Sequence, residues 1–154
     1  MRLTTFTDYC LRVLIYLAAE PDRRATIAEI ASSFEISESH LTKVVHQLGR
    51  KGWVATVRGK GGGVALAMSA SRIIVGDVVR AMEGELVPAE CFGTDACAIA
   101  RVCRLREVLT EAVEAFQEVL DRYTLADLVA GNPMLARLMF KDRVVAAPIM
   151  GVAS

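Results

Sequence analysis

The 154-residue chain lacks an apolar run long enough to span a bilayer. Its longest apolar stretch near the N-terminus, residues 13–19, is short and follows the charged residues Asp8 and Arg12, which is not the pattern of a signal peptide. The sequence therefore predicts a cytoplasmic protein. Thiols stay reduced in that compartment, which favours metal binding over disulfides for the cysteines.

The chain also lacks the sequence signatures of an enzyme. Its glycine run, residues 59–63, has neither the spacing nor the Lys-Ser/Thr pair of a phosphate-binding nucleotide loop. No nucleophile with a nearby base and no cofactor loop can be identified. We therefore expect no catalytic activity.

Acidic residues are missing from one long stretch. Net charge is zero, but residues 1–70 carry nine Lys/Arg against six Asp/Glu, whereas residues 71–154 carry nine against twelve. No acid lies between His40 and Gly63, and this interval holds five cations: Lys43, Arg50, Lys51, Arg58 and Lys60. Such a basic strip predicts contact with a polyanion, and we expect double-stranded DNA.

Three of the four cysteines, Cys91, Cys97 and Cys103, are separated by two gaps of five residues. Thiolates bind soft metal centres, and three on one short loop can enclose a compact iron–sulfur cluster. Zinc is the main alternative, but structural zinc sites usually pair ligands two to four residues apart, and no His lies nearby. Three unliganded thiols are a further alternative. A fourth ligand must come from elsewhere in the chain, from a partner subunit or from solvent.

The N-terminal half has the pattern of a helix-turn-helix. Apolar residues at helical spacing predict a first helix ending near Glu20. Thr26 and Glu29 form a capping box for a short second helix, and Ser37 begins a third helix that Gly52 ends. The third helix is polar and basic on its outer face, as a recognition helix is. The residues predicted to contact DNA there are Ser37, Ser39, His40, Thr42, Lys43, His46 and Arg50.

A β-wing is predicted after this helix. Residues 53–58 and 64–68 have the composition of strands, and the glycines between them form the turn. Arg58 and Lys60 lie beside these glycines, which let the backbone approach phosphates closely. We add both cations to the predicted DNA contacts.

The C-terminal half is predicted to contain a cluster-binding loop, residues 84–103, and helices over residues 104–143. The first of these helices, residues 104–123, has an apolar stripe too wide for one small domain to cover, which predicts dimerisation through a second copy. Packing within its own chain is the alternative. Residues 144–154 have neither periodicity nor charge and are predicted to be disordered.

The predicted fold class is therefore mostly α with a small β-wing: a winged helix-turn-helix DNA-binding domain, residues 1–83, followed by a long dimerisation helix.

Several motifs together carry a resemblance. They are Met-Arg-Leu-Thr at 1–4, Phe-Thr-Asp-Tyr at 6–9, Val-Arg-Gly-Lys-Gly-Gly-Gly at 57–63, Gly-Asp-Val-Val-Arg at 76–80, the three-cysteine loop, and Thr-Leu-Ala-Asp-Leu-Val at 124–129. Over roughly residues 1–140 the chain resembles the bacterial winged-helix iron–sulfur transcription regulators, the IscR/NsrR/RirA family. Within it, the Phe-Thr-Asp-Tyr start and the two five-residue gaps are most similar to the nitric-oxide-sensing NsrR branch.

This resemblance implies a homodimeric repressor with one 4Fe–4S cluster per subunit, a 2Fe–2S cluster being the alternative. It implies that Cys91, Cys97 and Cys103 are the thiolate ligands and that Asp8 of the other subunit is the fourth ligand. Arg12, one helical turn on, would hold Asp8 in place, although spacing alone indicates an ordinary surface ion pair. Nitric oxide is the implied signal. The Ala-Glu-Cys-Phe sequence at 89–92 and the apolar C-terminus are similar to the iron-responsive branch, so iron is the alternative signal.

Two further interpretations concern Cys10 and the class of protein. Residues two apart on a helix point about 200° from each other, so Cys10 and Asp8 cannot both face one iron, and we expect Cys10 to be a buried, inert thiol. An electron-transfer protein that carries a cluster and has no DNA target is the second hypothesis. The helix-turn-helix, the wing and the basic strip argue against it.

Overall fold

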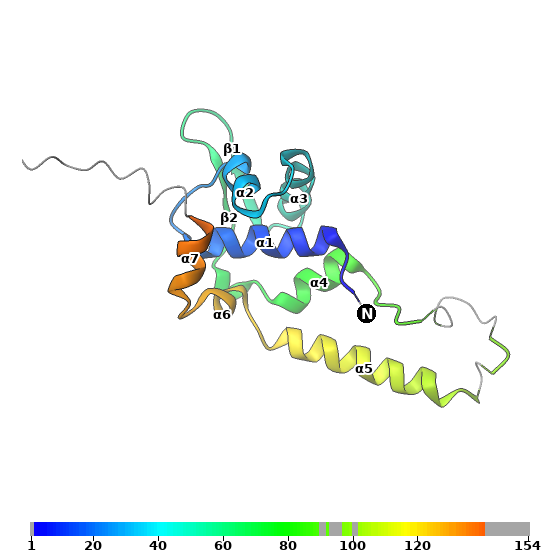
Figure 1. Cartoon of the computed structure of the whole chain (residues 1–154). Helices are drawn as coiled ribbons and strands as arrows, with labels where there is room; N and C mark the ends of the chain where they lie inside the picture. Colours follow the sequence, from blue (N-terminus) through cyan, green and yellow to red (C-terminus); the bar gives the residue numbers. More distant parts are fainter. Residues whose placement is uncertain (1, 90–91, 93–96, 100–101, 141–154) are drawn as a thin grey trace, which may run out of the picture.

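The computed structural model describes residues 2–89, 92, 97–99 and 102–140. Helix α1 (Thr5–Ala19) is central, with α2 (Ile27–Phe34) and α3 (Glu38–Arg50) on one side of it and α4 (Val75–Glu83) on the other (Figure 1). Because several elements pack on it, α1 buries residues over much of its circumference and not along one stripe only. Its buried residues are Thr7, Cys10, Val13, Leu14, Tyr16, Leu17 and Ala18.

The helix-turn-helix forms as the sequence predicts. The Glu29 carboxylate accepts a hydrogen bond from the Thr26 amide at 2.6 Å, and the Thr26 hydroxyl accepts one from the Glu29 amide at 3.1 Å, so both halves of the capping box are present. Glu35, in the left-handed region at φ 54°, reverses the chain after α2. The inner face of α3 is buried against the core through Leu41, Val44, Val45 and Leu48.

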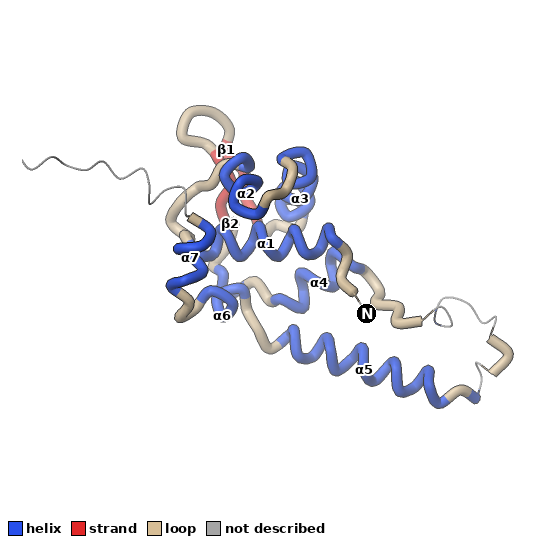
Figure 2. The backbone as a smooth tube through the Cα atoms, viewed as in Figure 1, coloured by secondary structure: helices blue, strands red, loops and turns tan. Residues whose placement is uncertain are grey.

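The wing is a two-stranded antiparallel sheet of β1 (Val54–Val57) and β2 (Gly63–Leu66), drawn in red in Figure 2. Both strands are shorter than predicted. At the start of β1, the Trp53 amide donates to the Leu48 carbonyl at 3.1 Å and so closes the end of α3. A short 3-10 helix, η1 (Ala70–Arg72), follows the wing and was not predicted; the Ser69 hydroxyl caps it.

The C-terminal half contains α5 (Arg104–Asp121), α6 (Leu125–Val129) and α7 (Pro133–Met139). The C-terminal end of α5 is fixed to α4, because Arg80 bridges Asp77 and Asp121, each at 2.7 Å. Gly76 permits this approach, since a Cβ there would collide with the Asp121 carboxylate. The rest of α5 extends beneath α4 (Figure 1), and none of its residues is buried.

The predicted fold class is confirmed, with a mostly helical chain and a small two-stranded wing. In the part of the chain described, no helix has both the length and the apolar character needed to cross a membrane. The prediction of disorder for residues 144–154 falls outside the described residues, and so do residues 90–91, 93–96 and 100–101 of the predicted cluster-binding loop. The domain boundaries stay predictions.

A carboxylate ties the start of α1 to the end of α4. Glu83 Oε1 accepts hydrogen bonds from the Thr4 amide at 2.7 Å and from the Thr4 hydroxyl at 3.0 Å. Partial burial acts to raise the pKa of Glu83, but hydrogen bonds from Thr7 and Thr4 outweigh it and hold the pKa below its ordinary value of 4.5. The folded state therefore prefers ionised Glu83.

Glu83→Gln should lower the free energy of unfolding at pH 7 by about 1 kcal/mol, because the charged acceptor is lost. A depressed folded-state pKa stabilises the protein fully above the unfolded value near 4.5, and this contribution disappears as pH falls through the folded pKa. The difference from wild type should therefore shrink as the pH falls below about 4.5, as measured by urea unfolding at pH 7 and at pH 3. Glu85→Gln, the same change at an exposed neighbour, is the control. A deficit that persists unchanged at pH 3 would contradict this account.

Candidate nucleic-acid interface and metal ligands

The outer face of α3 is available to a ligand. Ser37 caps the helix by accepting a hydrogen bond from the His40 amide at 3.4 Å, which satisfies a free backbone N–H of the first turn. Thr42 donates its hydroxyl proton to the Glu38 carbonyl at 2.8 Å. Every α3 residue predicted to contact DNA is exposed, namely Ser39, His40, Thr42, Lys43, His46 and Arg50, and so is the capping Ser37.

The wing turn presents the other two predicted contacts. Arg58 and Lys60 are both exposed and flank Gly59, which has φ 94°. The turn is tight, since a Cβ at Gly62 would lie 2.3 Å from the Val57 carbonyl oxygen. Glycine is needed there because no side chain fits. The result is a short cationic loop at the tip of the wing.

A ring contact that the sequence did not indicate joins α1 to the recognition helix. Tyr9 and His40 have ring centroids 6.3 Å apart. They line a cavity of about 230 Å³ together with Thr5, Phe6, Lys43 and Val44. Tyr9 follows Asp8 in sequence, so the turn of α1 that carries the candidate metal ligand also touches the DNA-reading helix. No periodicity could have predicted this contact, because it depends on how the two helices cross.

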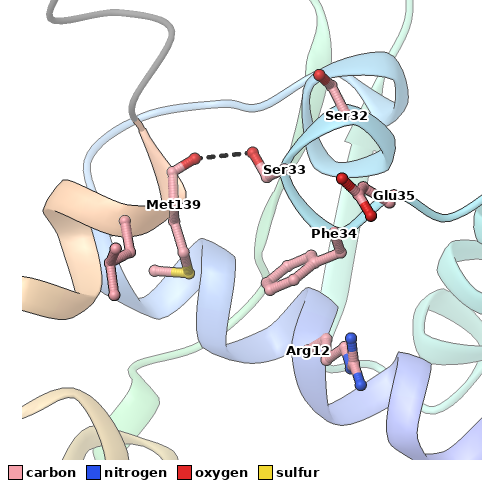
Figure 3. Close-up of a pocket in the computed structure, with 7 residues that line it drawn as sticks. Arg12, Ser32, Ser33, Phe34, Glu35 and Met139 are labelled. Carbon is pink, nitrogen blue, oxygen red and sulfur yellow. Dashed lines mark hydrogen bonds between the residues drawn. The ribbon is translucent and has the colours of Figure 1, made fainter.

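Asp8 and Arg12 form the ion pair that their spacing predicts. Arg12 Nη2 lies 2.9 Å from Asp8 Oδ2, and the two side chains are 43% and 46% exposed respectively. The Arg12 guanidinium also lies 5.9 Å from the centroid of the Phe34 ring, at the end of α2. Figure 3 shows Arg12 and Phe34 side by side at the edge of a cavity of about 460 Å³. Arg12 thus connects Asp8 to the helix-turn-helix.

The cysteines fall into two groups by exposure. Cys97 is exposed, Cys103 is half-buried at the start of α5, and both thiols are free; Cys91 lies outside the described residues. Cys10 is fully buried, and burial raises its pKa to about 12, so its thiol stays protonated in the core as expected. Free, accessible thiols fit an iron–sulfur cluster, and a protonated core thiol does not.

One chain does not assemble the predicted ligand set from the described residues. They contain no group of three His, Cys, Asp or Glu side chains placed to hold a metal ion. Figure 1 shows the start of α5, where Cys103 lies, well separated from α1, which carries Asp8. Within a single chain Asp8 is therefore remote from Cys103.

A winged helix-turn-helix with a basic, exposed recognition face defines a DNA-binding protein. The chain matches the Rrf2 family, described as an iron-dependent transcriptional regulator, over residues 3–131. It belongs to the Rrf2 family and is a transcription regulator, not an enzyme.

Two relatives of this chain carry the same name, NsrR. The chain is 46% identical over 146 residues to the HTH-type transcriptional regulator NsrR of Geobacillus kaustophilus, covering 93% of this chain and 99% of the relative. It is also 46% identical over 142 residues to the HTH-type transcriptional regulator NsrR of Bacillus subtilis, covering 90% and 97%. The predicted resemblance to the NsrR branch is confirmed.

Solved structures show the same fold. CymR (YrzC), the global cysteine regulator of B. subtilis, superposes with a TM-score of 0.71 at 30% identity, covering 84% of this chain and 97% of that one. IscR of T. potens superposes with a TM-score of 0.67 at 27% identity, covering 98% and 94%.

Arg58→Ala or Lys60→Ala should weaken binding to any duplex and reduce the salt dependence of log K by about one unit each, because each would remove one predicted phosphate contact. Thr42→Ala and Lys43→Ala should instead change the preference among operator sequences, since side chains near the start of a recognition helix face base edges. Titrations of operator and random duplex at several salt concentrations separate the two effects. An unchanged operator affinity for Arg58→Ala would remove the wing from the interface.

Proposed function

We propose that the protein is a homodimeric repressor whose operator binding is controlled by an iron–sulfur cluster that senses nitric oxide. Cys91, Cys97 and Cys103 would hold a 4Fe–4S cluster, and Asp8 of the partner subunit would complete it. The observation that carries the proposal is the position of Asp8, on the helix that packs directly against the recognition helix. The 46% identity to regulators named NsrR supports it.

The dimer part of the proposal is supported by α5. Leu105, Val108 and Val119 are 61%, 55% and 43% exposed, and no residue along the helix is buried by its own chain. An apolar stripe of this length in water disfavours an isolated chain, and a second copy of α5 would cover it. The separation of Asp8 from Cys103 within one chain also favours a ligand supplied by the partner.

The ligand types suit an exchangeable site. A carboxylate is a harder ligand for iron than a thiolate, so a bound cluster would supply a corner that a small molecule could enter at Asp8. Arg12 lies 2.9 Å from the Asp8 carboxylate and fixes its orientation. The carboxylate would thus be held in position for the cluster of the partner subunit.

The protein's own side chains would relay the signal. Two contacts join the turn of α1 that carries Asp8 to the helix-turn-helix. Tyr9 contacts His40 of α3, and Arg12 lies beside Phe34 of α2. A bridge between subunits through Asp8 would fix the distance between the two recognition helices. Loss of this bridge would let that distance vary.

Iron is the second candidate signal, because the matching family is described as an iron-dependent transcriptional regulator. The two signals predict different responses. A nitric-oxide sensor releases the operator when nitric oxide is added at constant iron, whereas an iron sensor releases it only when iron is withdrawn.

Alanine at Cys91, Cys97 or Cys103 should abolish stable cluster binding and specific DNA binding, because each removes one of three thiolates. Asp8→Ala should reduce operator affinity by about 10- to 100-fold while retaining most of the cluster, since solvent or a small thiol can fill its place. Cys10→Ala, at the buried thiol, is the control and should change neither. Iron and sulfide content, visible absorption and operator titration after anaerobic purification measure these effects.

The same preparation tests the signal. A few equivalents of nitric oxide per cluster should bleach the visible absorption and release the operator in parallel. Release by an iron chelator but not by nitric oxide would assign the protein to the iron-responsive alternative and leave the ligand set intact. Full cluster content in Cys103→Ala would contradict the ligand set itself.

Leu105→Glu or Val108→Glu should dissociate the dimer, because a second copy of α5 would bury these exposed positions and a buried carboxylate there costs several kcal/mol. Glu111→Gln, an exposed change on the same helix, is the control and should remain dimeric. Sedimentation at micromolar concentration measures the mass with and without metal. A monomeric wild-type protein would contradict the α5 interface.

A further inference from the structure

The base of the wing is held by the segment between α1 and α2. The Ala25 amide donates to the Val64 carbonyl at 2.9 Å, and the Val64 amide donates to the Ala25 carbonyl at 2.7 Å. Ala25 is buried, so this pairing lies in the core and anchors β2. A two-stranded hairpin is marginally stable alone. The position of the wing therefore depends on the segment that contains Ala25.

Arg24, the preceding residue, reaches the tip of the wing. Its Nη1 donates to the Gly61 carbonyl at 3.2 Å, across 37 residues of sequence. Gly61 has φ 74° and directly follows Lys60 in the turn. Glycine turns have the greatest backbone freedom, so a hydrogen bond to this carbonyl removes conformations from the loop that carries Lys60.

The backbone of Arg24 is itself fixed. Arg23 Nη1 donates to the Arg24 carbonyl at 3.0 Å, and the Arg23 guanidinium is held by Glu20 at 2.7 Å and by Glu29 at 3.1 Å. Glu29 is the capping-box residue of α2, so the network begins in the helix-turn-helix.

The wing approaches this segment closely only because residue 63 is glycine. A Cβ at Gly63 would lie 2.8 Å from the Ala25 carbonyl oxygen and 3.2 Å from the Arg24 Cβ, and its φ of 141° also disfavours a side chain. The close approach places Arg24 within reach of the turn.

We propose that Arg24 is a positioning residue for DNA binding, which holds the wing turn so that Arg58 and Lys60 are presented to the phosphate backbone. The inference rests on the wing being part of the DNA interface, as proposed above. A loop already ordered before binding loses less conformational entropy when it meets DNA. Arg24 thus acts through the other two cations.

A double-mutant cycle on the full-length cluster-containing protein tests this role. It compares wild type, Arg24→Gln, the double variant Arg58→Ala with Lys60→Ala, and the triple variant. Arg24→Gln should weaken operator binding by about five- to tenfold in the wild-type wing, as expected for one lost hydrogen bond, and by less than about twofold in the double-variant wing. Arg137→Gln, the same charge change at an exposed position of α7, is the control and should leave affinity unchanged.

The outcomes separate the inference from the proposed function. An equal loss in both backgrounds, with a salt slope lower by about one unit in each, would make Arg24 a direct phosphate contact and overturn the positioning role. An unchanged affinity for Arg24→Gln would overturn it too. Wild-type affinity in the double variant would refute the predicted contact of the wing with DNA, whatever Arg24 does.

A measurement without DNA gives an independent readout. The Gly62 amide donates to the Gly59 carbonyl at 2.9 Å inside the turn. Its hydrogen exchange in free Arg24→Gln should be faster than in wild type, while amides in the core of α1 should be unchanged. Equal exchange at Gly62 in the two proteins would overturn the inference.

Discussion

The burial of α1 is the constraint on which the other elements depend. This helix packs against the helix-turn-helix on one side and against α4 and α6 on the other, with Val13, Leu14 and Leu17 at most 2% exposed. Burying each such side chain stabilises the fold by about 1.5–3 kcal/mol. The helix-turn-helix and the C-terminal half therefore share one core, and a displacement of α1 must change the packing of both.

The same helix keeps one charged pair at its surface. Asp8 and Arg12 are each more than two-fifths exposed, and an exposed ion pair of this kind contributes little to stability. The Asp8 carboxylate can therefore exchange its partner without weakening the core. Its neighbours in sequence are buried or contact α3, so a change at Asp8 acts on a well-ordered helix, which is the requirement for a coupled site.

The two ends of α5 contrast in their support. The C-terminal end is fixed by Arg80 and Asp121, whereas along the rest of the helix no side chain is fully buried by its own chain. Most helical stability in proteins comes from tertiary packing of an amphipathic face, and along most of α5 the chain itself supplies only partial packing. The exposed apolar stripe of α5 is thus the surface of this chain that a second subunit would cover.

The sequence by itself determined the fold class and most of the helices, because capping boxes, apolar periodicity and glycine turns act over a few residues: Thr26 with Glu29 starts α2 as the local pattern predicts. It also identified the exposed face of α3 and the buried Cys10. Only the tertiary structure decided that Arg24 holds Gly61, that Glu83 holds Thr4 and that Tyr9 meets His40. These partners are far apart in sequence, and their meeting depends on how the helices and the wing pack around α1, which no local pattern encodes.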